Sequence, residues 1–412
     1  LAAMAALARG LVWASRAGSG CYEPGRPADD ESTVTLKFNI AAVDPSDGQG
    51  SRATEFEDAE LVREMIRTLR IIIVHADPTD ASRKVVEFNQ FWDLAGEAGA
   101  DDKTAIAASA SKEINVYAGT VEKGQDPKEV YDLKDIYVIA NEHGLYSGYS
   151  HSTFADASDR VLGAIDLSNE AYGSGMHLDD EALKRLERLT FDFRLSDNVN
   201  GLIPMAEHHQ VKVRHPRTDE QGNIVDREQS VSLFVTRALV KVTVKVTNTT
   251  SGSLELTGYR LTNLASTGYL FPVETVYTPA KEECQEENPL KDREITSFEI
   301  PAQQLGQMER TFTVKTTADG DNPYALEPIA AGKSVALPSV YMPESQSAEG
   351  FSFDISLFDE FRGTPQILKD MDALPRNTHL IINVTIGENS GMTINTVVLP
   401  YIGVNLEPGF GI

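Results

Sequence analysis

Residues 31–52 read ESTVTLKFNIAAVDPSDGQGSR, and the interpretation of the whole chain starts from them. Apolar residues alternate with polar ones in the first half, which is the period-2 pattern of a half-buried β-strand. The apolar positions are Val34, Leu36, Phe38 and Ile40. The strand leads into a loop of turn-forming residues that ends at Arg52, followed by the small residue Ala53. Two interpretations stay open here: an ordinary first strand, or a strand that is replaced after a cut in its loop.

Length and charge limit the class of protein. The chain has 412 residues, of which 41% are hydrophobic, which is enough for two domains with real cores. The formal net charge of −25 argues against nucleic acid as a partner, because nothing would neutralise the phosphates. Such a charge fits a soluble or surface-exposed protein whose copies repel one another.

The N-terminal segment 1–21 indicates export. It reads LAAMAALARGLVWASRAGSGC, an apolar run followed by small residues and Cys21. This is similar to a bacterial signal peptide ending in a lipobox, in which Cys21 becomes the lipidated first residue. Gly18 at position −3 and Arg9 within the apolar run depart from that pattern, so a poorly defined N-terminal tail is the alternative. The run is too short and interrupted for a transmembrane span and is excluded from the fold.

The remainder of the chain predicts an all-β protein. Apolar strand patterns recur before residue 215, and one helix is expected at 178–189 from its apolar stripe and its acidic start. From Val231 onward, many short alternating runs are separated by turn signals, which is typical of a β-sandwich. The expected parts are a removable strand and cleavage loop at 31–52 and two β-sandwich domains at 53–225 and 230–412.

Candidate chemical sites are few. His208, His209 and His215 cluster in the sequence, but neighbouring residues of a strand point to opposite faces, and an exposed loop is favoured over a metal site. Asp179 and Asp180 are expected to stabilise a helix N-terminus rather than to form an acid/base pair.

Cysteine and aromatic residues give no better candidate. Cys284 lies among carboxylates, which disfavours a reactive thiolate, and with Cys21 it is one of only two cysteines. Trp92, Phe88 and Phe91 fit core packing better than a sugar-binding platform. We therefore expect no enzyme activity, no metal and no cofactor.

Several motifs in a fixed order resemble one family. The segments are LKDIYVIANE (133–142), LIPMAE (202–207), FVTRALVKVTVKVTN (234–248), LTGYRLTNLASTGYLFP (256–272), VYMPES (340–345), LPRNTHLIINVTI (374–386) and PYIGVNLEPGFGI (400–412). Together they resemble the fimbrillin family of Bacteroidales, the subunits of type V pili, over roughly residues 31–412. Within the third motif, Leu239 and Val240 stand where the family usually has a small alanine.

The resemblance implies two transthyretin-like Greek-key β-sandwich domains, exported as a lipoprotein. In that family an Arg-specific trypsin-like protease removes the N-terminal strand, and the C-terminal strand of another subunit replaces it. Here Cys21 would be lipidated and the cut would fall between Arg52 and Ala53. The displaced strand would carry Val34, Leu36, Phe38 and Ile40, and the donor strand at 396–410 would carry Ile402, Val404, Leu406 and Phe410.

The implied function is a structural subunit of a cell-surface fimbria that supports adhesion and colonisation. The implied partners are other copies or homologous subunits, the protease, the outer membrane through the lipid, and a host surface ligand. A tip adhesin or a lipid-anchored base subunit is the alternative. Residues 396–410 would then be only the last strand of the second sandwich. In either case, residues 32–42 are expected in a groove of the first domain beside strands 69–74 and 133–141.

Overall fold

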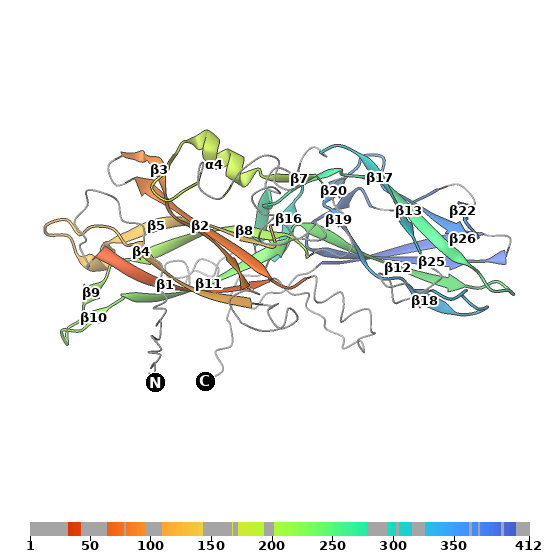
Figure 1. The fold of residues 1–412 in the computed structure, drawn as a ribbon, viewed down its shortest axis with the longest axis horizontal. Coiled ribbons are helices and arrows are strands. Elements are labelled where there is room, and N and C mark those ends of the chain that lie inside the picture. Colours follow the sequence, from red (N-terminus) through yellow and green to blue (C-terminus); the bar gives the residue numbers. More distant parts are fainter. Residues whose placement is uncertain are drawn as a thin grey trace, which may run out of the picture.

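The computed structural model describes most of the chain between Ser32 and Pro400. The described ranges are 32–42, 64–77, 80–94, 109–142, 167, 172–192, 202–277, 295–301, 305–314, 326–361, 365–369, 371–388 and 391–400. Strands dominate, and they form two β units that lie side by side along the long axis (Figure 1). The described part contains no helix long and apolar enough to cross a membrane.

An eight-stranded sheet, folded into two layers, forms the first unit. Its order is β4-β1-β11-β8-β5-β2-β3-β6. The bounds are β1 (Thr33–Ala42), β2 (Thr68–Asp77), β3 (Asp80–Asp93), β4 (Ser109–Tyr117), β5 (Tyr131–Ala140), β6 (His177–Leu178), β8 (Met205–Arg214) and β11 (Glu228–Arg237). The layer β4-β1-β11 packs against the layer β8-β5-β2-β3 around a common apolar core, which makes this unit a sandwich.

The strand β2 explains how the first unit is covered on both sides. Its residues are buried almost throughout, as expected for a strand with apolar residues on both faces. Ile71 and Ile73 face the core shared with β1, whereas Ile72 and Val74 face a second cluster. That second cluster lies under α4 (Asp180–Glu187), which covers the outer face of the sheet (Figure 1).

The second unit is a sandwich of two five-stranded sheets with one core between them. One sheet has the order β18-β12-β25-β26, with β19 also on β12, and the other has the order β17-β13-β21-β22, with β23 also on β21. The bounds are β12 (Leu239–Asn248), β13 (Leu256–Leu264), β17 (Met308–Thr313), β18 (Ser334–Ala336), β19 (Val340–Pro343), β21 (Ser352–Leu357), β22 (Glu360–Phe361), β23 (Gln366–Ile367), β25 (Thr378–Ile386) and β26 (Met392–Pro400).

Short elements complete the chain and join the two units. They are the 3-10 turn η2 (Pro127–Glu129) and the strands β7 (Thr190–Asp192), β9 (Arg217–Thr218), β10 (Ile224–Val225), β14 (Thr267–Tyr269), β15 (Glu274–Tyr277), β16 (Ile295–Glu299), β20 (Ser345–Gln346) and β24 (Ala373–Leu374). The pair β7–β14 links the two units directly, because β7 precedes β8 of the first and β14 follows β13 of the second.

Sheet membership changes at Ala238, later than the sequence indicates. The expected boundary of 225–230 places Val231 and its neighbours in the second domain, but β11 pairs with β1 and β8 of the first unit. The apolar run from Val231 is in fact two strands, and Ala238 lies between them, with its amide donating to Pro204 O at 2.9 Å. A continuous strand pattern hides such a change of sheet, because both strands are apolar.

Candidate functional site: the slot that β1 fills

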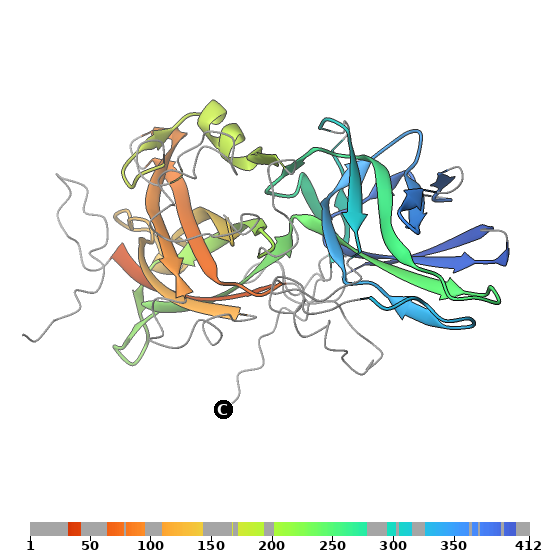
Figure 2. The same cartoon turned by 45° about the vertical axis from the view of Figure 1, so that its right-hand side comes forward.

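Strand β1 is the central strand of its layer, between β4 and β11 (Figure 2), and it forms a backbone ladder with each of them. Thr35–Ala42 lie parallel to Glu228–Val235 of β11. Thr33–Ala41 lie antiparallel to Ser109–Tyr117 of β4, in the reverse order. Replacing β1 would therefore require a strand that satisfies two different ladders at once.

The inward face of β1 completes the core of the first sandwich. Its four alternating apolar side chains are buried, with exposures of 0% for Val34, Leu36 and Ile40 and 1% for Phe38. They pack with apolar residues of β2, β4, β5 and β11 in one cluster. Burial of each such side chain contributes on the order of 1.5–3 kcal/mol, so the slot without β1 would expose a long apolar surface.

The expected neighbours of β1 were wrong in one respect. Strands 69–74 and 133–141 do not pair with β1, whose ladders go to β4 and β11. Instead, Leu69, Ile71 and Ile136 of β2 and β5 share one apolar core with Val34 and Phe38 of β1. The sequence marked these runs as buried strands, but alternation alone does not show which layer a strand joins.

The layer depends on β1 for its backbone hydrogen bonds. In the described part of the chain, β4 pairs with no strand other than β1. Strand β11 pairs with β8 at Thr236 and Arg237, so among the described strands residues 228–235 of β11 pair with β1 alone. Removal of β1 would thus leave two strands with unpaired edges, a state that favours pairing with another chain.

Side chains hold β8 to β11 where their backbones separate. The ring Nε2 of His209 lies 2.8 Å from Phe234 O, and Gln229 bonds the backbone N–H and C=O of Arg214 through its amide. At the edge of this region, where the short ladder between the two strands ends, Glu207 accepts a hydrogen bond from Thr236 Oγ1 at 3.2 Å. These contacts keep β11 in place without a continuous ladder, and they do not involve β1.

A hairpin of the second half of the chain covers this gap. Thr275 in β15 donates to Glu207 Oε1 at 3.1 Å, and Tyr277 makes an edge contact with Phe234 at 6.2 Å between ring centroids. Ile295 of the paired strand β16 packs in the same small cluster as Phe234. The strand that lines one wall of the slot is therefore supported from outside by the β15–β16 hairpin.

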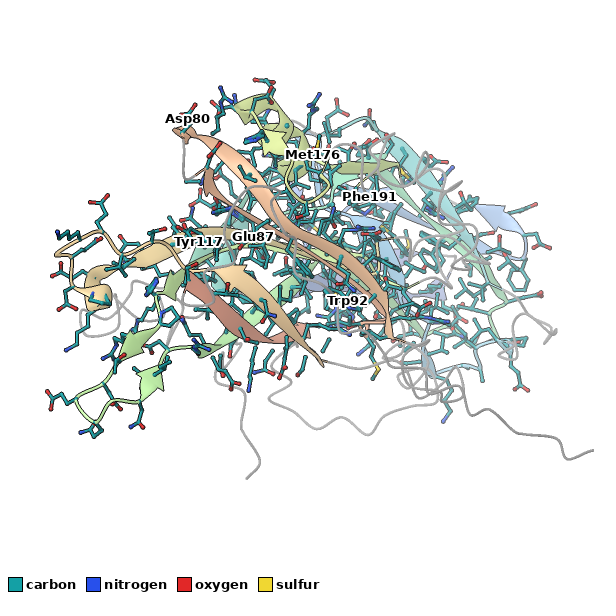
Figure 3. All side chains as sticks on the ribbon, turned by 60° about the vertical axis from the view of Figure 1, so that its left-hand side comes forward. Asp80, Glu87, Trp92, Tyr117, Met176 and Phe191 are labelled. Atoms are coloured by element: carbon teal, nitrogen blue, oxygen red, sulfur yellow. The ribbon has the colours of Figure 1, made fainter. Side chains whose placement is uncertain are left out.

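Near the other end of the slot, where β1 begins, a buried lysine lies between two partly buried carboxylates. Lys134 is fully buried and lies 2.6 Å from Glu87 Oε2 and 2.7 Å from Asp132 Oδ2. Glu87 also accepts a hydrogen bond from the amide of Tyr117, which lies opposite the first residue of β1. Figure 3 shows Glu87 and Tyr117 next to each other at this end of the sandwich.

The residues on either side of segment 43–63 both contact the C-terminal end of β11. Ala42 lies opposite Val235 in the β11 ladder. The Glu64 Oε2 atom lies 3.0 Å from Nη2 of Arg237, two residues further along β11. A cut anywhere in 43–63 would free β1 from the chain while Glu64 stays attached at the junction.

Glu64 joins the two halves of the molecule. Besides Arg237, it contacts Lys241 Nζ at 3.1 Å and accepts a hydrogen bond from the Tyr341 hydroxyl at 2.7 Å. Burial acts to raise the pKa of Glu64, but the Arg237 and Lys241 cations and the Tyr341 hydroxyl outweigh it and lower the pKa. The sequence identified Arg237 and Lys241 within a motif, but it gave no reason to select Glu64 from an acidic run.

Three of the motifs that carry the family resemblance meet around one buried arginine, Arg376. Arg376 is fully buried, forms a two-point ion pair with Glu344, and donates to Leu270 O at 2.9 Å and Tyr269 O at 2.8 Å. These residues come from three motifs that are far apart in the sequence. These three motifs thus form one buried polar joint rather than three separate surface sites.

Asn141, in the motif 133–142, connects the end of β5 to two other segments of the chain through its side chain. It adopts a left-handed backbone with φ of 55°, and its side chain donates to Met65 O at 2.8 Å and Ile203 O at 3.0 Å. Its Oδ1 accepts from Arg67 N at 2.9 Å, so one amide fixes the chain just after the 43–63 segment. Asparagine tolerates this backbone better than most residues.

Several predicted site residues lie outside the described residues. They are Cys21, Arg52, Ala53, Ile402, Val404, Leu406 and Phe410, as well as Cys284. The start of the predicted donor stretch is described: Thr396–Pro400 belong to β26 and pair with β25 of their own sheet. Their partner residues there are Thr378–Ile382, in antiparallel order.

The histidines were wrongly expected in an exposed loop. His208 and His209 lie within β8, and His209 and His215 are buried. As strand geometry requires, the first two point to opposite faces: His208 stacks on Tyr137 at 4.4 Å, and His209 bonds Phe234 O. No group of three or more His, Cys, Asp or Glu among the described residues could hold a metal ion.

Two other expectations from the sequence are confirmed. Asp179 caps α4, and its carboxylate accepts a hydrogen bond from Ala182 N at 2.7 Å. Phe88 and Trp92, both partly buried, stack at 6.0 Å and pack against the core that contains β1, whereas the Arg70 guanidinium lies 5.4 Å from the centre of the Phe91 ring.

Solved structures of fimbrial and cell adhesion proteins are similar to this chain. The tip fimbrial protein Mfa3 of Porphyromonas gingivalis is 12% identical with a TM-score of 0.44, covering 89% of this chain and 99% of its own. A candidate cell adhesion protein of Parabacteroides distasonis is 9% identical with a TM-score of 0.46, covering 89% and 97%. The fimbrial anchor protein Mfa2 of Porphyromonas gingivalis is 9% identical with a TM-score of 0.37, covering 89% and 99%.

These neighbours are of the class that the sequence motifs resemble, an all-β class of fimbrial proteins of Bacteroidales. At such low identities and TM-scores, these structural similarities do not by themselves indicate a function. No protein-family model matches the sequence, and no curated protein matches it.

Proposed function

We propose that this chain is a subunit of a cell-surface fimbria, and that β1 fills its slot only until the chain is cut after Arg52. A strand from another subunit then replaces β1. The observation that carries the proposal is that β1 is the backbone partner of both β4 and residues 228–235 of β11. Neither partner strand has a second ladder over those residues within the described chain.

The contacts of the slot explain why such a replacement is favourable. A new strand recovers up to two ladders of hydrogen bonds, each bond contributing about 0.5–1.5 kcal/mol net. It also buries apolar side chains in the positions of Val34, Leu36, Phe38 and Ile40. Strand addition of this kind needs no covalent bond, and the large buried surface makes dissociation slow.

The junction around Glu64 supports the same proposal from the other side of the cut. The ion pairs of Glu64 with Arg237 and Lys241 do not involve β1. They therefore hold the residues that follow the cut site in position while β1 leaves. Lipidation at Cys21 and transit through the outer membrane belong to the proposal as the route by which the precursor reaches the surface.

The test replaces the proposed cut site. Arg52→Ala is expected to abolish the polymer ladders of surface material and to keep residues 31–52 in the mature protein, as read by N-terminal sequencing. Arg83→Ala, which removes an arginine that is 61% exposed outside the slot, is the matched control and should leave both unchanged. Unchanged ladders in Arg52→Ala would refute processing at this site.

A tip or anchor subunit is the second candidate, and β26 favours it. Thr396–Pro400, the start of the predicted donor strand, are engaged with β25 of their own sheet. Deletion of residues 401–412 separates the roles. A stalk subunit would then end the fibre wherever it is added, whereas a tip subunit would be incorporated normally. An anchor would retain its lipidated Cys21 in surface material.

A further inference from the structure

Three charged side chains form a row across the outer face of the β4-β1-β11 layer. Lys37 Nζ in β1 lies 2.6 Å from Glu228 Oε2 of β11 and 4.0 Å from Glu113 Oε1 of β4. Its hydrogen bond with Glu228, together with the charge of that carboxylate, raises the pKa of Lys37. The strand that leaves thus carries the cation of the row, and the strands that stay carry the two anions.

The anions form what we call the acidic rim, Glu113 and Glu228. Glu113 lies opposite Lys37 in the β4 ladder, whereas Glu228 lies opposite Thr35 in the β11 ladder, so the two rim carboxylates flank the slot on a diagonal that Lys37 bridges. Both are well exposed, with side-chain exposures of 68% and 65%, and an open hollow of the surface lies over Lys37 and Glu113. Lys112 also lines this hollow, and its Nζ lies 5.0 Å from the centre of the Trp92 ring.

The C-terminal segment of this chain does not match the acidic rim. Residues 396–412 contain no lysine or arginine and one acidic residue, Glu407. In every register that turns its alternating apolar side chains into the slot, the outward positions are Val397, Leu399, Tyr401, Gly403, Asn405 and Glu407. None of these supplies a cation, and Glu407 would add a third carboxylate.

The net charge of the whole molecule also disfavours a second copy of this chain as the donor. A formal net charge of −25 makes two copies of this chain repel each other during the approach of one to the other. A less acidic chain, or one with a basic donor strand, approaches the rim without that cost. The local and the overall charge therefore disfavour the same occupant, a second copy of this protein.

We propose that the β1 slot selects a strand of a different chain, with lysine or arginine at the position of Lys37. This rests on the proposed function, since it assumes that the slot takes a new strand. Glu113 and Glu228 are then specificity-determining residues: they favour a basic donor strand and disfavour the neutral or acidic centre of the chain's own C-terminus.

Peptide exchange tests the proposal on the full chain. A site for a sequence-specific protease is placed within 43–52, the protein is cut, and fluorescent strand peptides are added. The peptides are residues 32–42, the same peptide with Lys37→Gln or Lys37→Glu, and residues 396–412. We expect the Lys37 peptide to bind about three- to tenfold more tightly than the Lys37→Glu peptide, with the difference shrinking at high salt.

Charge reversal of the rim gives the matched comparison. The double variant E113K/E228K is expected to prefer the Lys37→Glu peptide. The control E122K/E220K changes the net charge equally at two exposed residues outside the slot and should keep the original preference. Equal binding of all 32–42 peptides, or tighter binding of 396–412, would overturn the acidic-rim proposal while strand replacement stands. Uptake of no peptide at all would refute strand replacement itself, and the acidic-rim proposal with it.

Discussion

The carboxylate of Glu64 lies 3.0 Å from Nη2 of Arg237, an ion pair in which both side chains are at most 5% exposed. It connects the first described residue after the 43–63 segment to the last residue of β11, where the chain passes from one sheet to the next. Lys241 and Tyr341 of the second sandwich complete the coordination of this carboxylate.

Glu64→Ala is expected to destabilise the protein by about 3–5 kcal/mol, because it leaves the buried Arg237 cation and the partly buried Lys241 cation without this carboxylate. The midpoint of chemical unfolding measures the loss. The lowered pKa of Glu64 adds a pH signature: its stabilisation is present above its ordinary pKa and is lost as the pH falls through the folded value. Glu122→Ala, at an exposed position, is the control. An unchanged midpoint in Glu64→Ala would exclude a structural role for this junction.

Phe38→Ala should weaken the binding of β1 to its slot by about 3–5 kcal/mol of free energy. It removes the largest buried side chain of that strand and leaves a cavity in the core. After a cut within 43–63, β1 is expected to dissociate from the variant much faster than from the parent protein. Asn39→Ala changes the next residue on the outward face and should have little effect. Equal release rates for the two variants would show that the inward side chains do not hold β1.

Two buried groups on β8 give opposite pH dependences. Burial raises the pKa of Glu207 to about 7, although the hydrogen bond from Thr275 acts to lower it. The stabilisation by the protonated Glu207 is therefore fully present below the ordinary pKa of 4.5 and is lost as the pH rises through 7. Burial lowers the pKa of His209 to about 4, so its stabilisation is present above the ordinary value of 6.5 and is lost as the pH falls through 4.

Glu207→Gln is expected to remove the decline on the alkaline side, a term on the order of 3 kcal/mol, while the acid decline remains. Thermal unfolding as a function of pH measures both arms. His177→Gln, a change at a half-exposed histidine, serves as the control. It should leave the loss of stability at low pH unchanged. A Glu207→Gln curve that still falls between pH 5 and 7 would contradict the assignment.

Gly268→Ala should destabilise the link between the two units by about 1–3 kcal/mol, the usual cost of overpacking. A Cβ at this position would lie 2.5 Å from Cζ of Phe191, which is opposite it in the β7–β14 pair. Adding Phe191→Leu should recover part of the loss, because it removes the ring atoms in question. Gly252→Ala has open space around it and is the control. Additive effects of the two changes at the link would contradict direct contact.

The sequence predicted the all-β class and the strand at 33–42, because alternation of apolar residues depends only on local chain geometry. It also marked Arg237 as part of a motif. It did not predict that β1 pairs with β4 and β11, since alternation does not identify a partner strand. The buried position of His209 was missed for a related reason: β8 and β11 separate there, and only the fold shows that a side chain bridges the gap. Glu64 has the same local sequence context as its acidic neighbours, and only the position of Arg237 and Lys241 distinguishes it.

Ala42 and the Glu64 carboxylate are both held at the end of β11, and this bears on how the chain can be engineered. The entropic cost of closing a segment between two fixed points rises slowly with its length, by only about 0.6 kcal/mol for each doubling. Foreign epitopes or affinity tags inserted within 43–63 should therefore leave the folding stability of both sandwiches nearly unchanged.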